Sequence, residues 1–366
     1  MKKHKPVTSA PSAIRNLSAV ERFAIRPFAH SPIRYTLIAL LFVLLNLSTA
    51  CTNGQETPAL NEPEPVTLQL PWITQAQFAG YYVALDKGWY QEASIDLTIN
   101  PGGPDISSTD NVVNDFADFG VSLLPDVIAA IQDGKPIKSI AQIQQSNGLL
   151  LLAKKSSGIQ TPQDFVGHNV GVWFGSWESQ FQALIAREEI APQDFELVSQ
   201  GFSMEPFIND ELDVASAMIY NEYHAVLESG LKAEELNIIN YADYGLDFPG
   251  DALFTRTELI EQNPDLIIRM LRASLRGWQY AVEHPEEAAD IVLKYDKTGE
   301  QTRDHQLSMM TEIAKLVQAP VRPLGYTDRA DVRRTIDTLF TYGVLSQRVE
   351  PEDVFTNQFL EQVEPE

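Results

Sequence analysis

The sequence predicts an α/β protein with two lobes, and three observations support that prediction. The segment 68–101 has the order strand, helix, strand, which is the start of an α/β domain with a parallel sheet. A second series of strands and helices lies between Ile143 and Tyr241 and has the character of an inserted lobe. A helical third begins at Pro264. We expect each lobe to be a mainly parallel sheet with flanking helices, with the ligand in the cleft between them.

Length and charge limit the classes of function. A chain of 366 residues is long enough for two domains of ordinary size, each with its own hydrophobic core. The formal net charge is −23, and residues 1–50 carry seven basic side chains and one acidic one, so the remainder has a net charge of −29. A body this acidic repels nucleic acid and anionic membrane surfaces, which argues against both as binding partners.

The first 50 residues have the pattern of a bacterial secretion signal. A basic start is followed by the apolar run Tyr35–Leu47, which is too short for a bilayer span of about 20 residues. Three small residues then precede Cys51, as in a lipobox, and Cys51 is the only cysteine. We expect a signal peptide over 1–50, lipid attachment at Cys51 and a flexible tether over 51–65. The protein would then be held on the extracytoplasmic face of the cell membrane.

The turn after the first strand is the first candidate binding segment. It runs from Trp72 to Phe78 and leads into a helical segment, Tyr81–Gly88. Ligands of open α/β sheets bind beyond the carboxyl ends of the strands, so this turn would face the cleft. The amides of Gln75 and Gln77 and the nearby aromatic faces suit a planar, uncharged molecule. The candidate ligand-binding residues selected here are Trp72, Gln77, Phe78 and Tyr82. The alternative is that the rings, those of Tyr81 and Tyr82 above all, fill a core.

The rest of the first lobe continues the alternation of strands and helices. The expected elements are a strand at Ile95–Ile99, a helical stretch over Asp110–Gly120, a strand at Val121–Leu124, a helix at Pro125–Asp133 and a strand at Ile137–Ile143. Two more candidate residues lie here, Ser122 within its short strand and Gln144 directly after the last strand.

The second series supplies a candidate loop between a strand and a helix. The expected strands are Leu149–Lys154, Asn169–Trp173, Glu196–Ser199, Val214–Ile219 and Asn237–Tyr241, with a short helical segment at Pro162–Val166. After Trp173, Ser176 is a plausible N-cap, and Glu178 complements the helix dipole, which disfavours an anionic ligand. The candidates here are Trp173, Trp177 and Glu178. The alternative is that Ser176 and Glu178 only cap the helix.

A further candidate group follows the strand Val214–Ile219. Tyr220, Asn221 and Glu222 lie at its carboxyl end. Asn both donates and accepts hydrogen bonds and an ionised Glu accepts them, so this pair could read the edge of an amide-like heterocycle. A surface turn is the alternative. Tyr244, beyond the last strand of the series, would either close the cleft or form the hinge.

The C-terminal third indicates packing rather than chemistry. One apolar helix face, expected to pack on the first lobe, is formed by Ile267, Leu271, Leu275, Trp278 and Val282. The sequence has no Gly-rich phosphate loop, HExxH pair, GxSxG elbow or cysteine cluster. The histidines after the apolar run are widely separated and are expected at the surface: His168, His224, His284 and His305. These patterns favour a binding protein without a metal or cofactor.

Several long motifs resemble one family. They are WITQAQFAGYYVALDKGWYQEASIDLTINPGGPDI, ADFGVSLLPDVI, GVWFGSWE, MIYNEY, YADYGLDFPGD and LRASLRGWQYAVEHPEEAADIV, within about Val66–Ala319. Together they resemble the thiamine-pyrimidine-precursor group of periplasmic solute-binding proteins, including its riboflavin-binding lipoproteins. The resemblance implies a type II two-lobed binding protein of an ABC importer. The implied parts are lobe 1 over 66–143 and 245–325, lobe 2 over 144–244, and a C-terminal helical segment and tail over 326–366.

The same superfamily includes fungal enzymes that make the thiamine pyrimidine from pyridoxal phosphate and their own histidine. Those enzymes rely on an active-site histidine, a lysine and a cysteine-rich iron motif. Here Phe78 stands where the first-turn histidine is expected, and the sole cysteine is Cys51. The resemblance therefore favours a carrier over an enzyme. Asp115 replaces a glycine that commonly ends the helix before ADFG, and Asp tolerates the left-handed conformation that this turn needs.

The resemblance thus implies an extracytoplasmic lipoprotein that captures a flat heterocyclic vitamin and delivers it to a membrane permease with an ATPase subunit. Riboflavin is the first expectation, because the many aromatic residues at strand ends fit a three-ring system better than a single ring. A thiamine pyrimidine precursor, formylaminopyrimidine or hydroxymethylpyrimidine, is the alternative ligand. A thiamine-pyrimidine synthase-like enzyme is the remaining alternative.

Overall fold

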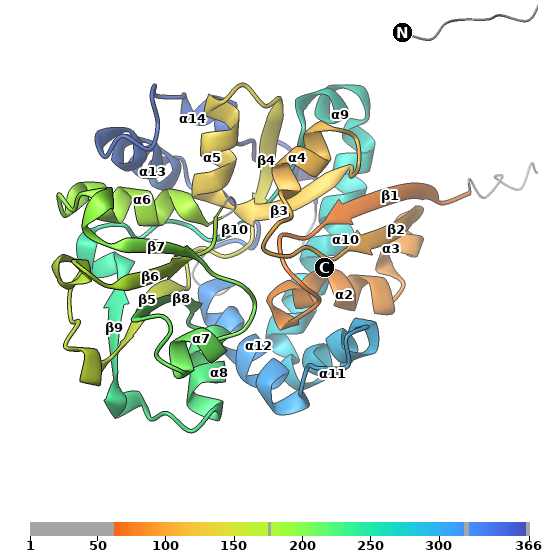
Figure 1. Ribbon diagram of the computed structural model, residues 1–366. Coiled ribbons are helices and arrows are strands. Elements are labelled where there is room, and N and C mark those ends of the chain that lie inside the picture. Colours follow the sequence, from red (N-terminus) through yellow and green to blue (C-terminus); the bar gives the residue numbers. More distant parts are fainter. Residues whose placement is uncertain (1–61, 175–176, 318–321, 364–366) are drawn as a thin grey trace, which may run out of the picture. The chain divides into compact units, whose positions relative to one another are not determined.

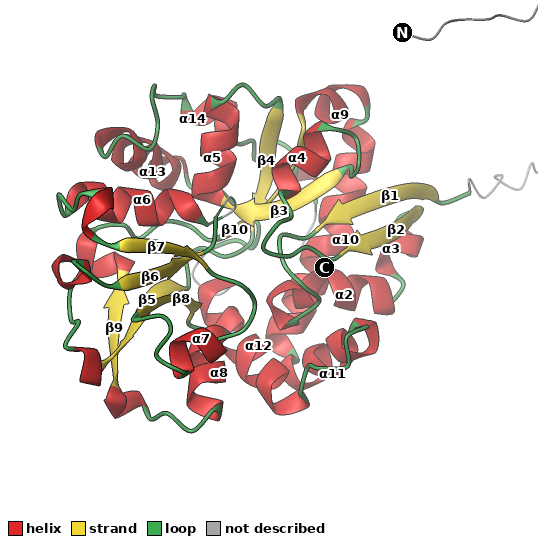
Figure 2. Ribbon diagram, viewed as in Figure 1, coloured by secondary structure: helices red, strands yellow, loops and turns green. Residues whose placement is uncertain are grey.

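Two five-stranded sheets, each with helices packed around it, make up the computed structural model, which describes residues 62–174, 177–317 and 322–363 (Figure 1, Figure 2). The chain leaves the first sheet after Gln142 and returns to it at Asp251. In the sequence, the strands of the second sheet therefore lie between two strands of the first sheet. The predicted two-lobed α/β fold is confirmed. The apolar run 35–47 and Cys51 lie outside the described residues.

The first sheet is mixed. Its strands are β1 (Glu64–Gln69), β2 (Ile95–Asn100), β3 (Phe119–Leu123), β4 (Ile137–Gln142) and β10 (Asp251–Arg256), in the order β2-β1-β3-β10-β4. β1 is parallel to β2 and β3, whereas β10 is antiparallel to β3 and β4. One antiparallel strand thus interrupts an otherwise parallel sheet. We call this sheet and its helices the first lobe.

Strand β10 was not predicted from the sequence. It reads DALFTR, and its first five residues are all buried. Because both faces of the strand are covered, the polar and apolar residues do not alternate along it, and so short a run gives no clear strand signal. The strand matters for the site because Asp251 pairs with Leu123, the last residue of β3. Asp251 is therefore placed at the edge where the parallel strands end.

The second sheet repeats this arrangement. Its strands are β5 (Leu149–Lys154), β6 (Asn169–Val172), β7 (Glu196–Ser199), β8 (Val214–Met218) and β9 (Leu236–Asn240), in the order β7-β6-β8-β5-β9. β6 is parallel to β7 and β8, and β5 is antiparallel to β8 and β9. All five predicted strands are confirmed, with ends that differ by at most one residue. We call this sheet and its helices the second lobe.

The helices flank both sheets. They are α2 (Ala79–Asp86), α3 (Trp89–Glu92), α4 (Ser108–Val113), α5 (Leu124–Gln132), α6 (Glu178–Arg187), α7 (Glu205–Ile208), α8 (Glu222–Glu228), α9 (Thr257–Gln262), α10 (Pro264–Glu283), α11 (Pro285–Tyr295), α12 (Arg303–Val317), α13 (Arg329–Thr341) and α14 (Pro351–Val354). Short 3₁₀ turns lie at Ala76–Phe78, Lys155–Ser157, Pro162–Phe165, Pro192–Asp194, Ala233–Glu235, Tyr241–Tyr244 and Leu360–Gln362. Among the helices of the described residues, none is long and apolar enough to cross a membrane.

The helical stretch predicted over Asp110–Gly120 is shorter than expected. Helix α4 ends at Val113, and β3 already begins at Phe119. The reason is Asp115, which has a φ of 60° and turns the chain out of the helix. This left-handed conformation confirms the prediction made for Asp115.

The predicted stripe on α10 packs against the first lobe. Ile267, Leu271 and Trp278 are buried, and the Trp278 ring meets the Tyr81 ring edge-to-face at 5.6 Å. Helices α2 and α10 approach each other closely at Gly80 and Gly277. An added Cβ on Gly277 would lie 2.0 Å from the Gly80 carbonyl oxygen. The stripe is therefore a packing surface, and α10 fixes α2 behind the turn that enters the cleft.

Candidate functional site

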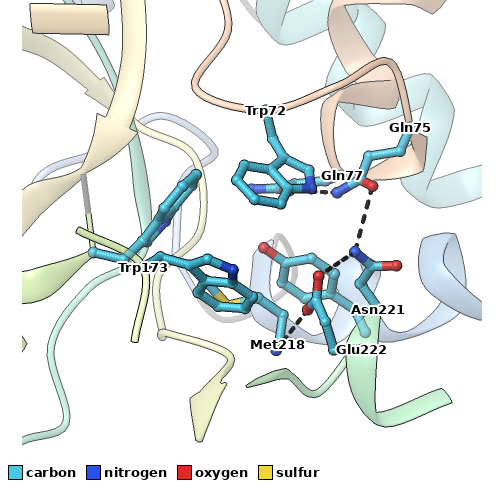
Figure 3. A pocket seen from close by; sticks show the side chains of 9 residues that line it. Trp72, Gln75, Gln77, Trp173, Met218, Asn221 and Glu222 are labelled. Carbon is cyan, nitrogen blue, oxygen red and sulfur yellow. Dashed lines mark hydrogen bonds between the residues drawn. The ribbon is translucent and has the colours of Figure 1, made fainter. Parts of the chain in front are cut away.

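A pocket lies between the ends of the two sheets, and residues of both lobes line it (Figure 3). The lining residues are Trp72, Gln75, Gln77, Trp173, Trp177, Met218, Tyr220, Asn221 and Glu222. Their side chains nearly fill the pocket and leave a cavity of about 10 Å³, which is room for about one water molecule. The first three residues follow β1, and the other six follow β6, end β8 or follow β8. These are the carboxyl ends of strands, where the sequence placed the ligand. Seven of the thirteen predicted ligand-binding residues are among the nine.

Aromatic rings form one side of the pocket. The Trp72 ring, from the first lobe, has its centroid 5.7 Å from that of Trp173 and 5.0 Å from that of Trp177. Trp72 also lies 4.7 Å from Phe202, a second-lobe ring that is half exposed at the rim. The two contacts between tryptophans are edge-to-face, which is a favourable arrangement of aromatic pairs. Three tryptophans from two lobes therefore meet where a planar ligand could enter between them.

One buried indole N–H in this cluster has no hydrogen-bond partner among the described residues. The Trp173 Nε1 donates to the Gly201 carbonyl at 3.2 Å. The Trp177 Nε1 is buried and has no hydrogen-bond partner within the described part of the chain. Leaving a buried donor unsatisfied costs about 1–3 kcal/mol. A ligand acceptor that reached Trp177 would remove this cost.

A chain of amides and one carboxyl group forms the first-lobe side of the polar end. Gln75 Nε2 donates to Gln77 Oε1 at 2.8 Å, and Gln77 Nε2 donates to Asp251 Oδ2 at 2.8 Å. Gln144 Nε2 donates to the same carboxyl oxygen at 3.0 Å. Burial raises the pKa of Asp251 to about 7, against the hydrogen bond from Gln77. This chain fixes the amide orientations, so that Gln75 turns its carbonyl oxygen toward the second lobe.

The second-lobe side is built at the start of α8. Glu222 Oε2 accepts from the Met218 backbone N–H at 2.9 Å, and Glu222 Oε1 accepts from Asn221 Nδ2 at 2.6 Å. Glu222 is buried, which raises its pKa to about 7 although these hydrogen bonds favour the ionised form. Asn221 Nδ2 also faces Gln75 Oε1 across the cleft at 3.5 Å. In Figure 3, Trp173 lies at the left of the pocket and Gln75, Asn221 and Glu222 at the right.

Tyr220 forms part of the pocket wall through a fully buried ring. Its hydroxyl has no hydrogen-bond partner among the residues that the structure covers. Burial is the main cause that raises the pKa of Tyr220 well above its usual value, and the nearby carboxyls of Asp251 and Glu222 add to it. Tyr220 therefore remains protonated and can donate a hydrogen bond to a ligand acceptor.

Four predicted residues lie in or behind the first lobe rather than in the pocket lining. Phe78 is fully buried in the core beside α2, which is the alternative that the sequence left open for the aromatic rings. Tyr82 is buried on α2, where its hydroxyl lies 2.9 Å from Thr74 Oγ1 and its ring packs on Tyr295. Ser122 is buried within β3, and Gln144 lies behind the lining, on Asp251. Gln144 thus supports the polar end from the second layer.

Two predicted residues of the second lobe also lie outside the lining. Glu178 is the first residue of α6 and accepts from Gln182 Nε2 at 2.6 Å, which fits the helix-start alternative. Ser176 lies outside the described residues. Tyr244 is half-buried at the end of a 3₁₀ turn, with the Arg187 guanidinium 6.0 Å from its ring. Neither residue is among those that line the pocket.

The surface position expected for His305 is wrong. The side chain is buried, with Nδ1 lying 3.0 and 3.1 Å from the two Glu228 carboxyl oxygens and Nε2 lying 2.9 Å from Asn221 Oδ1. Its partners are 77 and 84 residues away in the sequence, so no local pattern indicates the contact. Asp251 was missed for a related reason, since β10 itself was not predicted. Met218 was missed because it is the last residue of a buried strand.

Comparisons with known proteins identify the family of the chain. Residues 75–288 match the family model described as NMT1/THI5 like. Over 347 residues the chain is 27% identical to the riboflavin-binding protein RibY of Chloroflexus aurantiacus, covering 88% of this chain and 95% of the relative. Over 340 residues it is 26% identical to the formylaminopyrimidine-binding protein of Halalkalibacterium halodurans, covering 88% and 98%. It is also 31% identical over 230 residues to the 4-amino-5-hydroxymethyl-2-methylpyrimidine phosphate synthase of Legionella pneumophila, covering 62% and 72%.

Solved structures show the same fold at low identity. The periplasmic aliphatic sulphonate binding protein SsuA of Escherichia coli aligns with a TM-score of 0.60 and 15% identity, over 80% of this chain and 91% of that chain. The periplasmic nitrate-binding protein NrtA of Synechocystis PCC 6803 aligns with a TM-score of 0.64 and 15% identity, over 82% and 88%. These likenesses establish the periplasmic-binding-protein fold. Because the family model covers more than half of the sequence, the chain belongs to the NMT1/THI5-like family.

Proposed function

We propose that this protein is an extracytoplasmic substrate-binding lipoprotein of an ABC importer, which captures a flat heterocyclic vitamin and delivers it to a permease with an ATPase subunit. The observation that supports this most is a cleft whose two lobes each contribute both aromatic rings and amide groups. Tryptophan faces can stack on a planar ring while the amides and Glu222 read its edge. Two relatives that match along nearly their whole length are named binding proteins.

Riboflavin is our first candidate ligand. Trp72, Trp173 and Trp177 offer more aromatic surface than a single ring needs, and the Trp177 N–H, which has no partner among the described residues, can donate to a carbonyl oxygen. The cavity between the lining residues is about 10 Å³, far below the roughly 300–1,000 Å³ of drug-sized ligand pockets. A three-ring flavin would therefore enter only after Trp72 separates from the second-lobe rings. Opening of the lobes would separate them.

A thiamine pyrimidine precursor is the second candidate. Its single ring needs less separation of the lobes than three rings do, because the cavity between the lining residues is only about 10 Å³. Asn221 Nδ2 donates to Gln75 Oε1 at 3.5 Å, so opening of the lobes would free one donor and one acceptor for the edge of a ligand. That pair matches the alternating donors and acceptors of an aminopyrimidine edge.

A carrier fits these residues better than a synthase does. Phe78 occupies the first-turn position and is fully buried in the core, so it can neither bind nor transfer a proton. We expect the protein to bind its vitamin reversibly and to return it chemically unchanged. Mass spectrometry of protein and ligand after incubation with pyridoxal phosphate tests this. Loss of a histidine from the chain, or any pyrimidine product, would overturn the carrier assignment.

Purification from a vitamin-replete culture tests the ligand directly. A bound flavin gives a yellow protein with its own absorbance spectrum, whereas a pyrimidine leaves the protein colourless. Calorimetric titration of the stripped protein with riboflavin and with formylaminopyrimidine then ranks the two. Tight binding of riboflavin supports the first candidate, and tight binding of the pyrimidine alone supports the second. Binding of neither contradicts the proposed function.

A further inference from the structure

His305 joins the two lobes beside the pocket. We propose that His305 is a positioning residue, which latches the lobes together and fixes the Asn221 amide in the orientation that faces the ligand. This inference rests on the proposed function, because it assumes that the cleft binds a ligand between the lobes. It concerns a side chain that does not line the pocket and acts through Asn221 and Glu228.

Helix α12, which carries His305, is fixed to the first lobe. Helix α12 packs against α10, α11 and the 3₁₀ turn Ala76–Phe78. The neighbouring side chain, Gln306, accepts from the Ala76 backbone N–H at 2.6 Å. Ala76 lies between Gln75 and Gln77, so α12 is anchored to the same turn that forms the first-lobe wall of the pocket.

Both partners of the imidazole belong to the second lobe. Glu228 ends α8 and Asn221 precedes it, and the ring bridges them over this short helix. The imidazole is buried, with 8% of His305 exposed, whereas the Glu228 side chain is 52% exposed, so water reaches the Glu228 end of the bridge. A ring held at both nitrogens cannot rotate without breaking a hydrogen bond. His305 therefore connects the first lobe to the second at a defined position.

His305 also fixes the orientation of the Asn221 amide. Its Oδ1 faces His305, and its Nδ2 faces Glu222 Oε1 at 2.6 Å and Gln75 Oε1 at 3.5 Å. If the amide flipped, its oxygen would face the Glu222 carboxyl and its nitrogen would face the imidazole. The Glu228 carboxyl and Asn221 Oδ1 are both acceptors, so this arrangement has a proton on each ring nitrogen. The proton on Nε2 is the one that holds Asn221 with its N–H toward the cleft. Loss of this bond would leave Asn221 free to present either group.

His305 lies far from the crossing between the lobes, about which the lobes would rotate. The Leu316 carbonyl, near the end of α12, accepts from the Gln145 backbone N–H at 2.8 Å, next to the first crossing between the lobes. His305 lies eleven residues earlier on the same helix, which is about 16 Å along its axis. A rotation about the crossing would move His305 relative to α8 much more than it would move Leu316. The contact can therefore form in a closed state and break in an open one.

Three substitutions at His305 separate the two roles. The Asn side chain places its nitrogen near the position of Nδ1, so His305→Asn should keep the Glu228 contact and lose the Asn221 contact. The Gln side chain reaches the position of Nε2, so His305→Gln should keep the Asn221 contact and lose the Glu228 contact. His305→Ala removes both. His284→Ala is the matched control, because His284 is exposed at the end of α10.

Two measurements read these roles in the full chain. Calorimetry with riboflavin and with formylaminopyrimidine gives affinity and discrimination. Electron–electron double resonance between spin labels gives the distance between the lobes. The labels are placed at two exposed positions, Glu286→Cys on α11 and Glu234→Cys beyond α8, with Cys51→Ser in the background.

We expect His305→Ala to weaken the tighter ligand about tenfold, in the range of one lost buried hydrogen bond. It should also lengthen or broaden the distance between the labels in the ligand-free protein. His305→Gln should keep the preference between the two ligands, and His305→Asn should keep the distance. If His305→Ala matches His284→Ala in both measurements, the inference is wrong. If the unsubstituted protein binds neither ligand, the proposed function fails, while the ligand-free distance still tests the latch.

Discussion

At the residue scale, Trp177 combines two kinds of recognition in one side chain. Its ring packs edge-to-face on Trp72, and its N–H is buried without a partner in the described part of the chain. The ring can contribute about 0.5–1.5 kcal/mol through aromatic geometry beyond the area that it buries. The N–H can contribute a hydrogen bond whose absence now costs about 1–3 kcal/mol. Separate substitutions can remove one contribution or both.

Trp177→Ala should weaken riboflavin and formylaminopyrimidine alike, by about tenfold or more, because both ligands lose a stacking face. Trp177→Phe keeps a ring and loses the N–H, so it should mainly weaken the ligand whose carbonyl accepts from Trp177. Calorimetric titration of both variants measures this. Trp89→Ala serves as the control, since Trp89 packs on Tyr280 and Arg276, away from the pocket. Equal affinities for Trp177→Ala and the control would show that the ligand binds elsewhere.

The buried carboxyl of Glu222, which lines the pocket, makes the unfolding free energy depend on pH. Burial raises the pKa of Glu222 from 4.5 to about 7, so the folded protein binds more protons at Glu222 than the unfolded chain does between these values. For a carboxyl with a raised pKa, the unfolding free energy is highest below about pH 4.5 and falls as the pH rises to about 7. The expected loss from this residue is about 3 kcal/mol. Asp251 acts in the same direction, because burial raises its pKa to about 7 as well.

Glu222→Gln should therefore lose less stability than the unsubstituted protein between pH 4.5 and pH 7.5. The amide does not ionise, so the difference in unfolding free energy between these pH values should shrink by up to about 3 kcal/mol. Urea denaturation at the two pH values measures it. Glu286→Gln, an exposed change on α11, should leave the difference unchanged. An equal pH dependence in Glu222→Gln and the unsubstituted protein would mean that Glu222 is ionised in the folded state.

At the element scale, the contact between α2 and α10 depends on two glycines. Gly80 lies under the Trp278 ring, and Gly277 lies against the Gly80 carbonyl oxygen. Side chains at these positions would hold the helices apart. Helix propensity alone predicts that alanine at position 277 would stabilise the protein, because glycine in a helix interior is about 1 kcal/mol less favourable than alanine. The structure thus reverses the sign expected from helix propensity.

Gly277→Ala should destabilise the protein. The new Cβ would lie 2.0 Å from a backbone oxygen, which cannot move aside as a flexible side chain can. Overpacking of this kind costs about 1–3 kcal/mol, which exceeds the gain in helix propensity. Urea denaturation of Gly277→Ala and of Gly201→Ala gives the comparison, since nothing lies within 4 Å of a Cβ at Gly201. A stabilised Gly277→Ala would mean that α10 and α2 are further apart in solution.

At the scale of the whole molecule, local patterns predicted most of the strands, whereas residues whose placement depends on long-range contacts were missed or misplaced. The strand ends that carry Trp72, Trp173 and Asn221 were found because apolar runs and turns are written in neighbouring residues. β10 was missed because a strand buried on both faces has no alternation, and Asp251 was missed with it. His305 was misplaced because its environment is made by α8, about 80 residues away. Asp251 and His305, which support the polar end of the pocket from behind, are thus the residues that sequence periodicity could not place.

The last prediction concerns where the whole molecule is held. Cys51 follows the apolar run Tyr35–Leu47 and precedes the first described residues by about ten positions, which is enough chain for a tether to a membrane. Acyl chains on Cys51 would anchor a body whose strong negative charge otherwise repels anionic lipid. Cys51→Ser should therefore move the protein from the membrane fraction to the soluble fraction, with ligand affinity unchanged because the pocket lies within residues 72–222. Cell fractionation followed by titration of the released protein checks both parts, and membrane association that persists in Cys51→Ser would exclude lipidation as the anchor.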